Sequence, residues 1–438
     1  MATANSSELR SLLEDLFRAA VTAVDPQRLV EAAMPELKAE TYEQVFVIAV
    51  GKAAAPMMRG AYNALGSQIS RALVVLKPGH GEPPPGVEVV AGGHPVPNQG
   101  SIDAATRVLE ILEDADESTL CLFLISGGGS ALMEKPIDTK PAIDLEALQQ
   151  TTQLLLRAGA PIEEINAVRK HLSAVKGGRA AAAAAPARVV SLILSDVVGD
   201  RLDTIASGPT APDNTSYQDA KAILEARGIW TSVPPAVAAT ITRGTDGKLP
   251  ETLKPGDRRL DAVDNLILGS NAVALSAAED ESRRRGYSTV TLSSSVVGEA
   301  REIAPVLIAV GREIAAHNRP LAAPAVVLAG GETTVTVTGA GVGGRNQEAA
   351  VAALCNLQSH PFPAGRRLLF LAAATDGNDG PTDAAGGFAS PEIAALPLNP
   401  RAALANNDSY HFLRNAGALF SPGATGTNVC DMWALVVV

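Results

Sequence analysis

The chain has 438 residues, a formal net charge of −11 at pH 7, 46% hydrophobic residues and only 3% aromatic residues. This length favours two or three domains, each able to bury a core, and the composition is that of a soluble α/β protein. The acidic charge argues against nucleic acid or an anionic membrane as a default partner. A site for anionic ligands therefore needs its own local cluster of cations.

The cysteines and the N-terminal segment favour the cytoplasm. Cys121, Cys355 and Cys430 lie far apart in apolar surroundings, so we interpret them as small core residues of a protein in a reducing compartment. Residues 9–20 have helical spacing but lack the basic start and continuous apolar core of a signal peptide. No uncharged apolar run reaches the ~18 residues that a membrane span needs.

The first candidate site residue follows the first predicted strand. Residues 45–50 form an apolar run typical of a buried strand, which ends in Gly51-Lys52 before a predicted helix with Pro56 in its first turn. Open α/β sheets place ligand-binding residues at the carboxyl end of a strand. A bound anion would explain a lysine in a first helical turn, and an ordinary solvated lysine is the alternative.

The next two predicted strands, residues 73–76 and 87–90, lead into rigid turns that each carry a histidine, His80 and His94. Either histidine could contact a substrate, although single histidines in such turns are more often structural. A helix over residues 101–112 follows, and it precedes the strand around which the first half of the chain is organised.

Residues 120–133 predict a strand, a glycine turn and the start of a helix. The apolar run 120–125 has the length of a buried strand, and three consecutive glycines let backbone N–H groups converge on one ligand. The helix N-terminus would favour a phosphate or carboxylate, and a tight turn without ligand is equally consistent. The predicted phosphate-binding residues are Ser126, Gly127, Gly128, Gly129 and Ser130.

Basic residues gather in the next region. We expect residues 141–185 to be helical, so that Arg169, Lys176 and Arg179 fall on nearby faces and form a local positive field. A solvated basic helix face is the alternative. The strand predicted over 189–194 runs into Asp196, which is placed to hold Mg²⁺ or a substrate hydroxyl, or to cap a helix.

Proline- and glycine-rich sequence within residues 213–262 indicates a boundary, so the predicted domains are residues 1–262 and 263–438. The strand–helix alternation then restarts with strands over 266–270, 288–292 and 325–329. Residues 332–338 alternate as a half-exposed strand does. A glycine-rich loop follows and ends at Arg345, whose planar guanidinium suits phosphate oxygens, with a surface ion pair as the alternative.

The strand predicted over 368–374 leads into an Asp-, Asn- and Gly-rich loop. The glutamate expected at the end of a calcium-binding loop is missing, so that interpretation fails. Asp376, Asp379 or Asp383 could instead contact a metal–nucleotide complex or a ribose, and a plain turn is nearly as consistent.

Taken together, these segments resemble the glycerate 2-kinase family, whose members have an N-terminal α/β domain and a C-terminal MOFRL domain. The resemblance runs in the same order from about residue 10 to the C-terminus. The stretches that carry it are VIAVGKAA (47–54), GGHPVPN (92–98), LISGGGSAL (124–132), INAVRKHLSAVKGG (165–178), LSDVVGD (194–200), IASGPT (205–210), GGETTV (330–335), GGRNQE (343–348) and DGNDGPTDAAG (376–386).

The resemblance implies a two-domain α/β fold: an N-terminal Rossmann-like doubly wound sheet, a C-terminal mixed α/β domain and an active site in the cleft between them. It also implies ATP-dependent phosphorylation of D-glycerate to 2-phospho-D-glycerate and ADP, with Mg²⁺ or another divalent cation. The family's proposed catalytic lysine and arginine fall on Lys52 and Arg345.

On this hypothesis Asp196 positions the metal ion or accepts the proton of the attacking hydroxyl, and Asp376 and Asp379 contact the nucleotide. Arg169, Lys176 and His94 would bind the substrate. The rival hypothesis is an NAD(P)H-dependent hydroxypyruvate reductase, because some relatives carry that name. Against it, no predicted strand–helix unit has the GxGxxG fingerprint after its first strand. A homodimer is left open.

Overall fold

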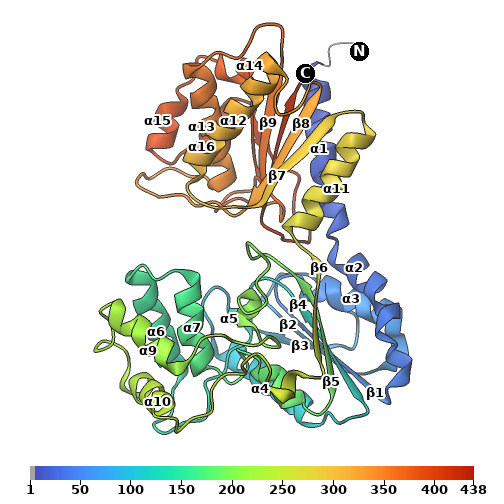
Figure 1. The fold of residues 1–438 in the computed structure, drawn as a ribbon, viewed down its shortest axis with the longest axis vertical. Coiled ribbons are helices and arrows are strands. Elements are labelled where there is room, and N and C mark those ends of the chain that lie inside the picture. The colour runs from blue at the N-terminus through green and yellow to red at the C-terminus, as the bar shows by residue number, and fades with distance from the viewer. Residues whose placement is uncertain (1–4) are drawn as a thin grey trace. The chain divides into compact units, whose positions relative to one another are not determined.

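The computed structural model describes residues 5–438, which form two compact units (Figure 1). The N-terminal unit is Pro26–Leu268, and the C-terminal unit joins residues 269–438 to the N-terminal segment that ends at Asp25. The division predicted at residue 262 lies close to this one along the chain. It differs in the first helix, α1 (Ser6–Ala23), which packs in the C-terminal unit.

The N-terminal unit is built on a sheet with the strand order β3-β2-β1-β4-β5-β6. Strands β3, β2, β1, β4 and β5 are parallel, and β4 is buried along its whole length, as its apolar sequence predicts. The strands are β1 (Gln44–Val50), β2 (Ile69–Leu76), β3 (Glu88–Ala91), β4 (Thr119–Ile125), β5 (Arg188–Leu194) and β6 (Val263–Gly269).

The helices of this unit fall into two groups. One group packs against the sheet, and α6, α7, α9 and α10 form a separate bundle around Leu155, Val168 and Leu224 (Figure 1). The helices are α2 (Pro26–Ala33), α3 (Ala54–Leu65), α4 (Gln99–Glu113), α5 (Gly129–Leu132), α6 (Leu145–Arg157), α7 (Ile162–Leu172), α8 (Arg179–Ala184), α9 (Tyr217–Ala226) and α10 (Pro235–Thr245).

Residues 141–185, predicted to be helical, form the three helices α6, α7 and α8 with breaks between them. The chain leaves the helical path between α6 and α7 and again between α7 and α8. The second break begins at Ser173, whose backbone is extended, and it ends at Gly177 and Gly178, which take φ values of +58° and +81° just before α8. Arg169, Lys176 and Arg179 therefore do not share one helical surface.

The C-terminal unit contains a mixed sheet with the strand order β11-β10-β9-β12-β8-β7, in which β12 runs antiparallel to both β8 and β9. Its strands are β7 (Ser288–Val296), β8 (Ala325–Gly331), β9 (Leu368–Ala374), β10 (Gly386–Ala389), β11 (Leu419–Phe420) and β12 (Asp431–Val437). The predicted α/β class, with a doubly wound sheet in one domain and a mixed sheet in the other, is confirmed.

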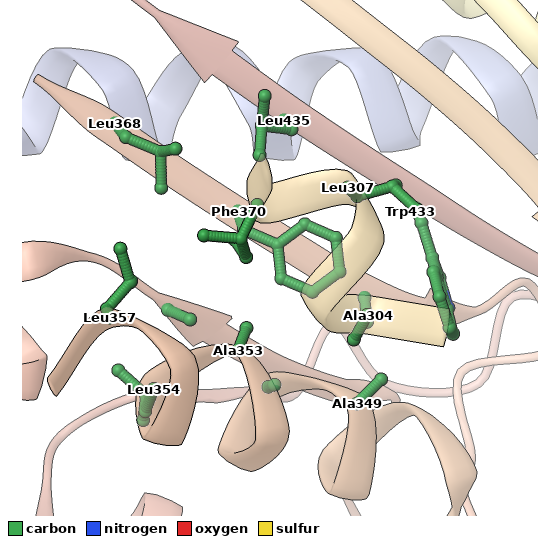
Figure 2. Packing of buried hydrophobic residues seen from close by; sticks show 14 of the residues in the cluster. Ala304, Leu307, Ala349, Ala353, Leu354, Leu357, Leu368, Phe370, Trp433 and Leu435 are labelled. Carbon is green, nitrogen blue, oxygen red and sulfur yellow. The ribbon is translucent and has the colours of Figure 1, made fainter. Parts of the chain in front are cut away.

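Helices cover both faces of this sheet, with α12 and α13 on one side and α1 and α11 on the other (Figure 1). On the first side the Phe370 and Trp433 rings meet edge to face at 5.9 Å, and Leu307 and Ala353 lie close by (Figure 2). Besides α1, the helices are α11 (Asn271–Arg284), α12 (Ala300–His317), α13 (Arg345–Ser359), α14 (Pro391–Ala394), α15 (Pro400–Ala405) and α16 (Ser409–Asn415).

The half-exposed strand predicted over residues 332–338 is wrong, because only one isolated bridge, Glu299–Thr334, forms there. Up to Thr334 the backbone bonds to residues 296–300, and beyond it side chains satisfy the backbone. Glu299 accepts the N–H of Thr336, and Asn407 Oδ1 accepts the N–H groups of Thr338 and Gly339. Alternating threonines and valines cannot distinguish such a loop from a strand.

Candidate functional site

The strand order of the N-terminal unit reverses between β1 and β4. From β1 the chain order proceeds outward through β2 to β3, and from β4 it proceeds the other way through β5. Open parallel sheets bind ligands at such a topological switch point, outside the carboxyl ends of the strands. Lys52 follows β1 and the loop 126–130 follows β4, so the two sequence-predicted segments lie at this point.

Backbone hydrogen bonds join the two segments. The N–H of Lys52 donates to the carbonyl of Gly127 at 2.8 Å, and the N–H of Ala53 donates to Ser126 Oγ at 3.0 Å. The Ser126 hydroxyl is buried and itself lies 3.4 Å from the Val50 carbonyl. Ser126 therefore shapes the loop, and its predicted contact with a phosphate is not what this geometry favours.

The glycines keep open the space that three functional side chains approach. A Cβ on Gly127 would overlap the carboxylate of Asp196. A Cβ on Gly128 would lie 3.1 Å from His94 Cδ2 and 3.5 Å from Lys52 Cγ. Lys52, His94 and Asp196 thus come together around the loop, with the carboxylate beside Gly127 and the two basic residues beside Gly128.

The helix after the loop is shorter than expected. Helix α5 contains four residues, so it is too short to supply the aligned dipoles on which a helix-terminus anion site depends. The prediction that this helix N-terminus helps to bind a phosphate is therefore not supported. What the loop offers instead is backbone N–H groups held close to basic side chains.

Ser130 is tied to a strained turn that sequence reasoning missed. Its Oγ lies 2.7 Å from Ser207 Oγ, which donates to Asn166 Oδ1 at 3.0 Å. Ala206 and Ser207 have φ values of +50° and +60°, a left-handed conformation that costs about 1–3 kcal/mol per residue. Such strain persists only where the surroundings enforce it, and no residue-type signal announces it because neither residue is glycine.

The predicted substrate-binding pair Arg169 and Lys176 is occupied by interior contacts. Lys176 is 1% exposed, and its Nζ lies 2.8 Å from Glu134 Oε2 and 3.1 Å from the Met133 carbonyl. Burial lowers the pKa of Lys176 to about 8. Arg169 donates to the Ser130 carbonyl at 3.0 Å and contacts Glu134 at 3.2 Å. The structure thus corrects the expectation that Lys176 faces a ligand. The Arg169 side chain instead holds the glycine loop through the backbone carbonyl of Ser130.

The pKa of His94 is lower than that of an ordinary histidine. Burial first, and then the positive charges of Lys52 and Lys77, lower the pKa of His94 to about 4. The ring is therefore neutral at pH 7, where it can offer one N–H donor and one lone pair to a substrate.

In the C-terminal unit, Arg345 is the first residue of α13. Its Nε and Nη2 bind the two oxygens of Asp431 at 2.6 and 3.0 Å, and Nη1 lies 3.0 Å from Glu332. Although burial opposes it, the neighbouring Asp431 charge raises the pKa of Arg345. The side chain is 29% exposed. Nε and Nη2 each donate one hydrogen bond to Asp431, so N–H groups of the guanidinium are left for another anion.

Asp379 caps α13. The side chain is buried, and its two oxygens accept the N–H groups of Asn346 at 3.2 Å and Gln347 at 2.8 Å. Burial raises the pKa of Asp379 to about 6. Asp376 is half-buried and accepts the N–H of Asn378 at 2.9 Å within its turn. Asp379 is thus committed to the helix, and the nucleotide-binding roles of both residues stay predictions.

These features define an α/β protein of two units with a basic, glycine-lined site at the switch point of its parallel sheet. Two family models match the chain: the "Domain of unknown function (DUF4147)" model over residues 12–242 and the MOFRL family model over residues 325–431. Among residues 5–438, no helix is both long and apolar enough to cross a membrane.

Similar proteins match this chain over nearly its whole length. The D-glycerate 2-kinase of Thermotoga maritima is 41% identical over 97% of both chains. The glycerate 2-kinase of Pyrococcus horikoshii is 40% identical over 97% of this chain and 94% of its own. A crystal structure of the Thermotoga maritima glycerate kinase matches with a TM-score of 0.89, at 40% identity, and covers 99% of this chain and 100% of its own.

A protein of Agrobacterium vitis named as a putative hydroxypyruvate reductase is 36% identical over 99% of this chain and 96% of its own. With these matches, the chain belongs to the glycerate 2-kinase family.

Proposed function

We propose that this protein transfers a phosphoryl group from ATP to the 2-hydroxyl of D-glycerate and so forms 2-phospho-D-glycerate and ADP. The observation that carries the proposal is the convergence of Lys52, the triglycine loop and Asp196 at the switch point of the N-terminal sheet. The names of its relatives, which cover nearly the whole chain, supply the substrate.

The roles follow from the chemistry of phosphoryl transfer, in which proteins mainly position the groups and neutralise charge. Lys52 offers a compact positive charge to the transferring phosphoryl group, and the N–H groups of the loop 127–129 offer donors at close range. Asp196 either accepts the proton of the attacking hydroxyl or contacts the metal ion. Arg345, in the other unit, keeps its predicted role in stabilising phosphoryl charge, and Arg169 orients the loop.

Mg²⁺ would arrive with ATP. Within residues 5–438, no three His, Cys, Asp or Glu side chains converge as a ready-made metal site. Mg²⁺ in kinases is commonly held by one or two carboxylates together with substrate phosphates and waters. The single carboxylate of Asp196 beside the loop fits that requirement, and the ion would supply charge neutralisation on the phosphates.

The test is a phosphorus NMR spectrum of the product formed from D-glycerate and MgATP. We expect the resonance of a phosphate ester on the secondary carbon, together with ADP. The Lys52→Ala variant should lose about 10³-fold in kcat, in the range of other charge-stabilising residues, whereas Lys140→Ala, at an exposed lysine, should not. A product phosphorylated on the primary carbon, or an unaffected Lys52→Ala enzyme, would contradict the proposal.

The reductase alternative has one structural observation in its favour, because the strand order is that of dinucleotide-binding domains. The loop after β1, however, does not have the GxGxxG pattern: counted from Gly51, Ala53 occupies the place of the glycine that would admit a pyrophosphate, and Pro56 occupies the place of the third glycine. Oxidation of NADH or NADPH by the pure protein with hydroxypyruvate, at enzyme-like rates, would favour the reductase. A predicted homodimer and a cytoplasmic location stay predictions.

A further inference from the structure

Two more basic residues lie at the carboxyl edge of the N-terminal sheet. Lys77 follows the last residue of β2, and His80 lies three residues further in the same loop. Val50 pairs with Val75 and Leu76 pairs with Ala91, so the ends of β1, β2 and β3 are adjacent. Because these strands are parallel, Lys52, Lys77, His80 and His94 all emerge at one edge.

The loop that carries Lys77 and His80 is held against the first turn of α3. A Cβ on Gly81 would lie 3.3 Å from the Cβ of Ala55, and Arg59 Nη1 donates to the Glu82 carbonyl at 2.6 Å. The His80 N–H also donates to the Lys77 carbonyl at 3.1 Å. The loop therefore presents its basic side chains from a fixed backbone next to Lys52.

Neither Lys52 nor Lys77 makes an ion pair within residues 5–438. Among residues 5–438, no hydrogen-bond acceptor or carboxylate lies within bonding distance of Nζ of Lys52 or Lys77. By contrast, the buried Lys170 and Lys176 each contact a carboxylate in the same unit. Two neighbouring half-buried lysines that make no ion pair of their own leave positive charge that an anionic ligand can neutralise.

The members of the cluster affect one another. Burial, then Lys77 and Lys52, lower the pKa of His80, and the same lysines together with His80 act on His94. The four groups therefore share one electrostatic environment, in which an added positive charge is unfavourable and an added negative charge is favourable.

We propose that Lys77 and His80, with Lys52 and His94, form a subsite for the polyphosphate chain of the nucleotide. The nucleotide's identity rests on the function proposed above. The two lysine charges, with the neutral histidines as hydrogen-bond donors, favour a ligand of high charge: D-glycerate carries a single carboxylate, whereas each phosphate of a triphosphate carries between about one and two negative charges near neutral pH. Asp196 lies beside Gly127, where its carboxylate can face the substrate hydroxyl or a metal ion bound to the phosphates.

The experiment measures the binding of inorganic tripolyphosphate and of ATP to the full-length protein by titration calorimetry. Lys77→Gln should weaken tripolyphosphate binding about tenfold or more, which corresponds to ~1.4 kcal/mol. His80→Gln should weaken it several-fold. Lys77→Arg should retain binding, because it keeps the charge. Lys140→Gln, at an exposed lysine elsewhere, should match the wild type.

Steady-state kinetics then assign the subsite to one substrate. We expect Lys77→Gln to raise the KM for ATP and to leave the KM for D-glycerate within about twofold. An unchanged affinity for tripolyphosphate in Lys77→Gln would overturn the proposal, and so would a rise confined to the KM for D-glycerate. The tripolyphosphate titration needs no turnover, so it decides the subsite even if the protein fails to phosphorylate D-glycerate.

Discussion

Gly127 is the residue whose missing side chain matters most to the site. A Cβ there would overlap Oδ2 of Asp196, so Gly127→Ala must displace the carboxylate or the loop. The backbone of Gly127 is not in the left-handed region, and alanine therefore adds steric displacement without conformational strain. We expect kcat to fall about 10²-fold, the scale set by a displacement of roughly 1 Å at a reacting group, with little change in melting temperature.

The matched control lies two residues away. A Cβ on Gly129 would meet only apolar atoms, at 3.0 Å from the Ala206 Cβ and at 3.5 Å from Val50. Gly129→Ala should therefore cost stability more than kcat. If both variants lose the same activity, the role of Asp196 beside the loop is contradicted and general loop rigidity explains the loss.

His94 predicts a pH dependence whose sign follows from its lowered pKa. The folded protein binds a proton at this ring only near pH 4, whereas an unfolded histidine does so near its ordinary value of 6.5. Between these values the unfolded state holds more protons, so stability falls as the pH drops from about 6.5 toward 4. His94→Asn should flatten this part of the profile. Urea unfolding of both proteins across that range measures it, and parallel profiles would contradict the assignment.

At the scale of elements, two backbone N–H groups at the N-terminus of α13 donate to the carboxyl of Asp379. Asp379→Ala leaves these buried donors unsatisfied, and we expect the C-terminal unit to lose ~1–3 kcal/mol. Trp433 reports on this end of the helix, because its indole N–H donates to Asn346 Oδ1. Fluorescence-monitored urea unfolding in a Trp230→Phe background, which leaves Trp433 as the only tryptophan, measures the loss.

The same carboxyl gives that loss a pH dependence. The pKa of Asp379 is raised to about 6 from 3.8, so the folded state holds the extra proton in this window. The contribution of Asp379 is therefore fully present below about pH 3.8 and shrinks as the pH rises through 6. An Asp379→Ala cost that instead grows with pH would mean that the charged carboxylate is the favoured cap. An unchanged KM for ATP would confirm that the role of Asp379 is structural.

The sequence predicts a strand correctly where the strand is buried on both faces, because burial then requires apolar residues throughout. Strands β1, β4, β5 and β9 are covered on both faces, so each appears as a continuous apolar run. The strand ends then located Lys52, the glycine loop and Asp196 at one edge. The short strands β10 and β11, with Gly-Gly and only two residues respectively, carry no such pattern.

The rest of the site depends on contacts between segments that are distant in sequence. The strained Ser207 turn, the burial of Lys176 against Glu134 and the proximity of Lys77 to His94 arise from packing between loops. No local periodicity encodes them. For the same reason, sequence spacing did not reveal that Arg169 and Lys176 both contact Glu134, although α7 ends between them.

At the scale of the whole molecule, α1 belongs to the C-terminal unit although it precedes the N-terminal unit in the sequence. Its apolar stripe predicts a helix but not its partner. In the structure Phe17 meets Phe420 edge to face at 5.0 Å, Arg10 donates to the Leu419 carbonyl, and the Val24 carbonyl accepts from Thr427. Residues 5–25 therefore complete the core of the C-terminal unit, although the family model that begins at residue 12 extends through the N-terminal unit to residue 242.

This placement can be tested in the intact chain with two single-tryptophan backgrounds. Leu13 in α1 is fully buried, so Leu13→Ala should cost ~2–5 kcal/mol. We expect the loss in the unfolding transition reported by Trp433 in a Trp230→Phe background. The transition reported by Trp230 in a Trp433→Phe background should not move. Leu155→Ala is the matched control, because Leu155 is equally buried in the helical bundle against which Trp230 packs, and it should shift only the Trp230 transition. If Leu13→Ala shifts the Trp230 transition alone, α1 stabilises the N-terminal unit, and its assignment to the C-terminal unit is wrong.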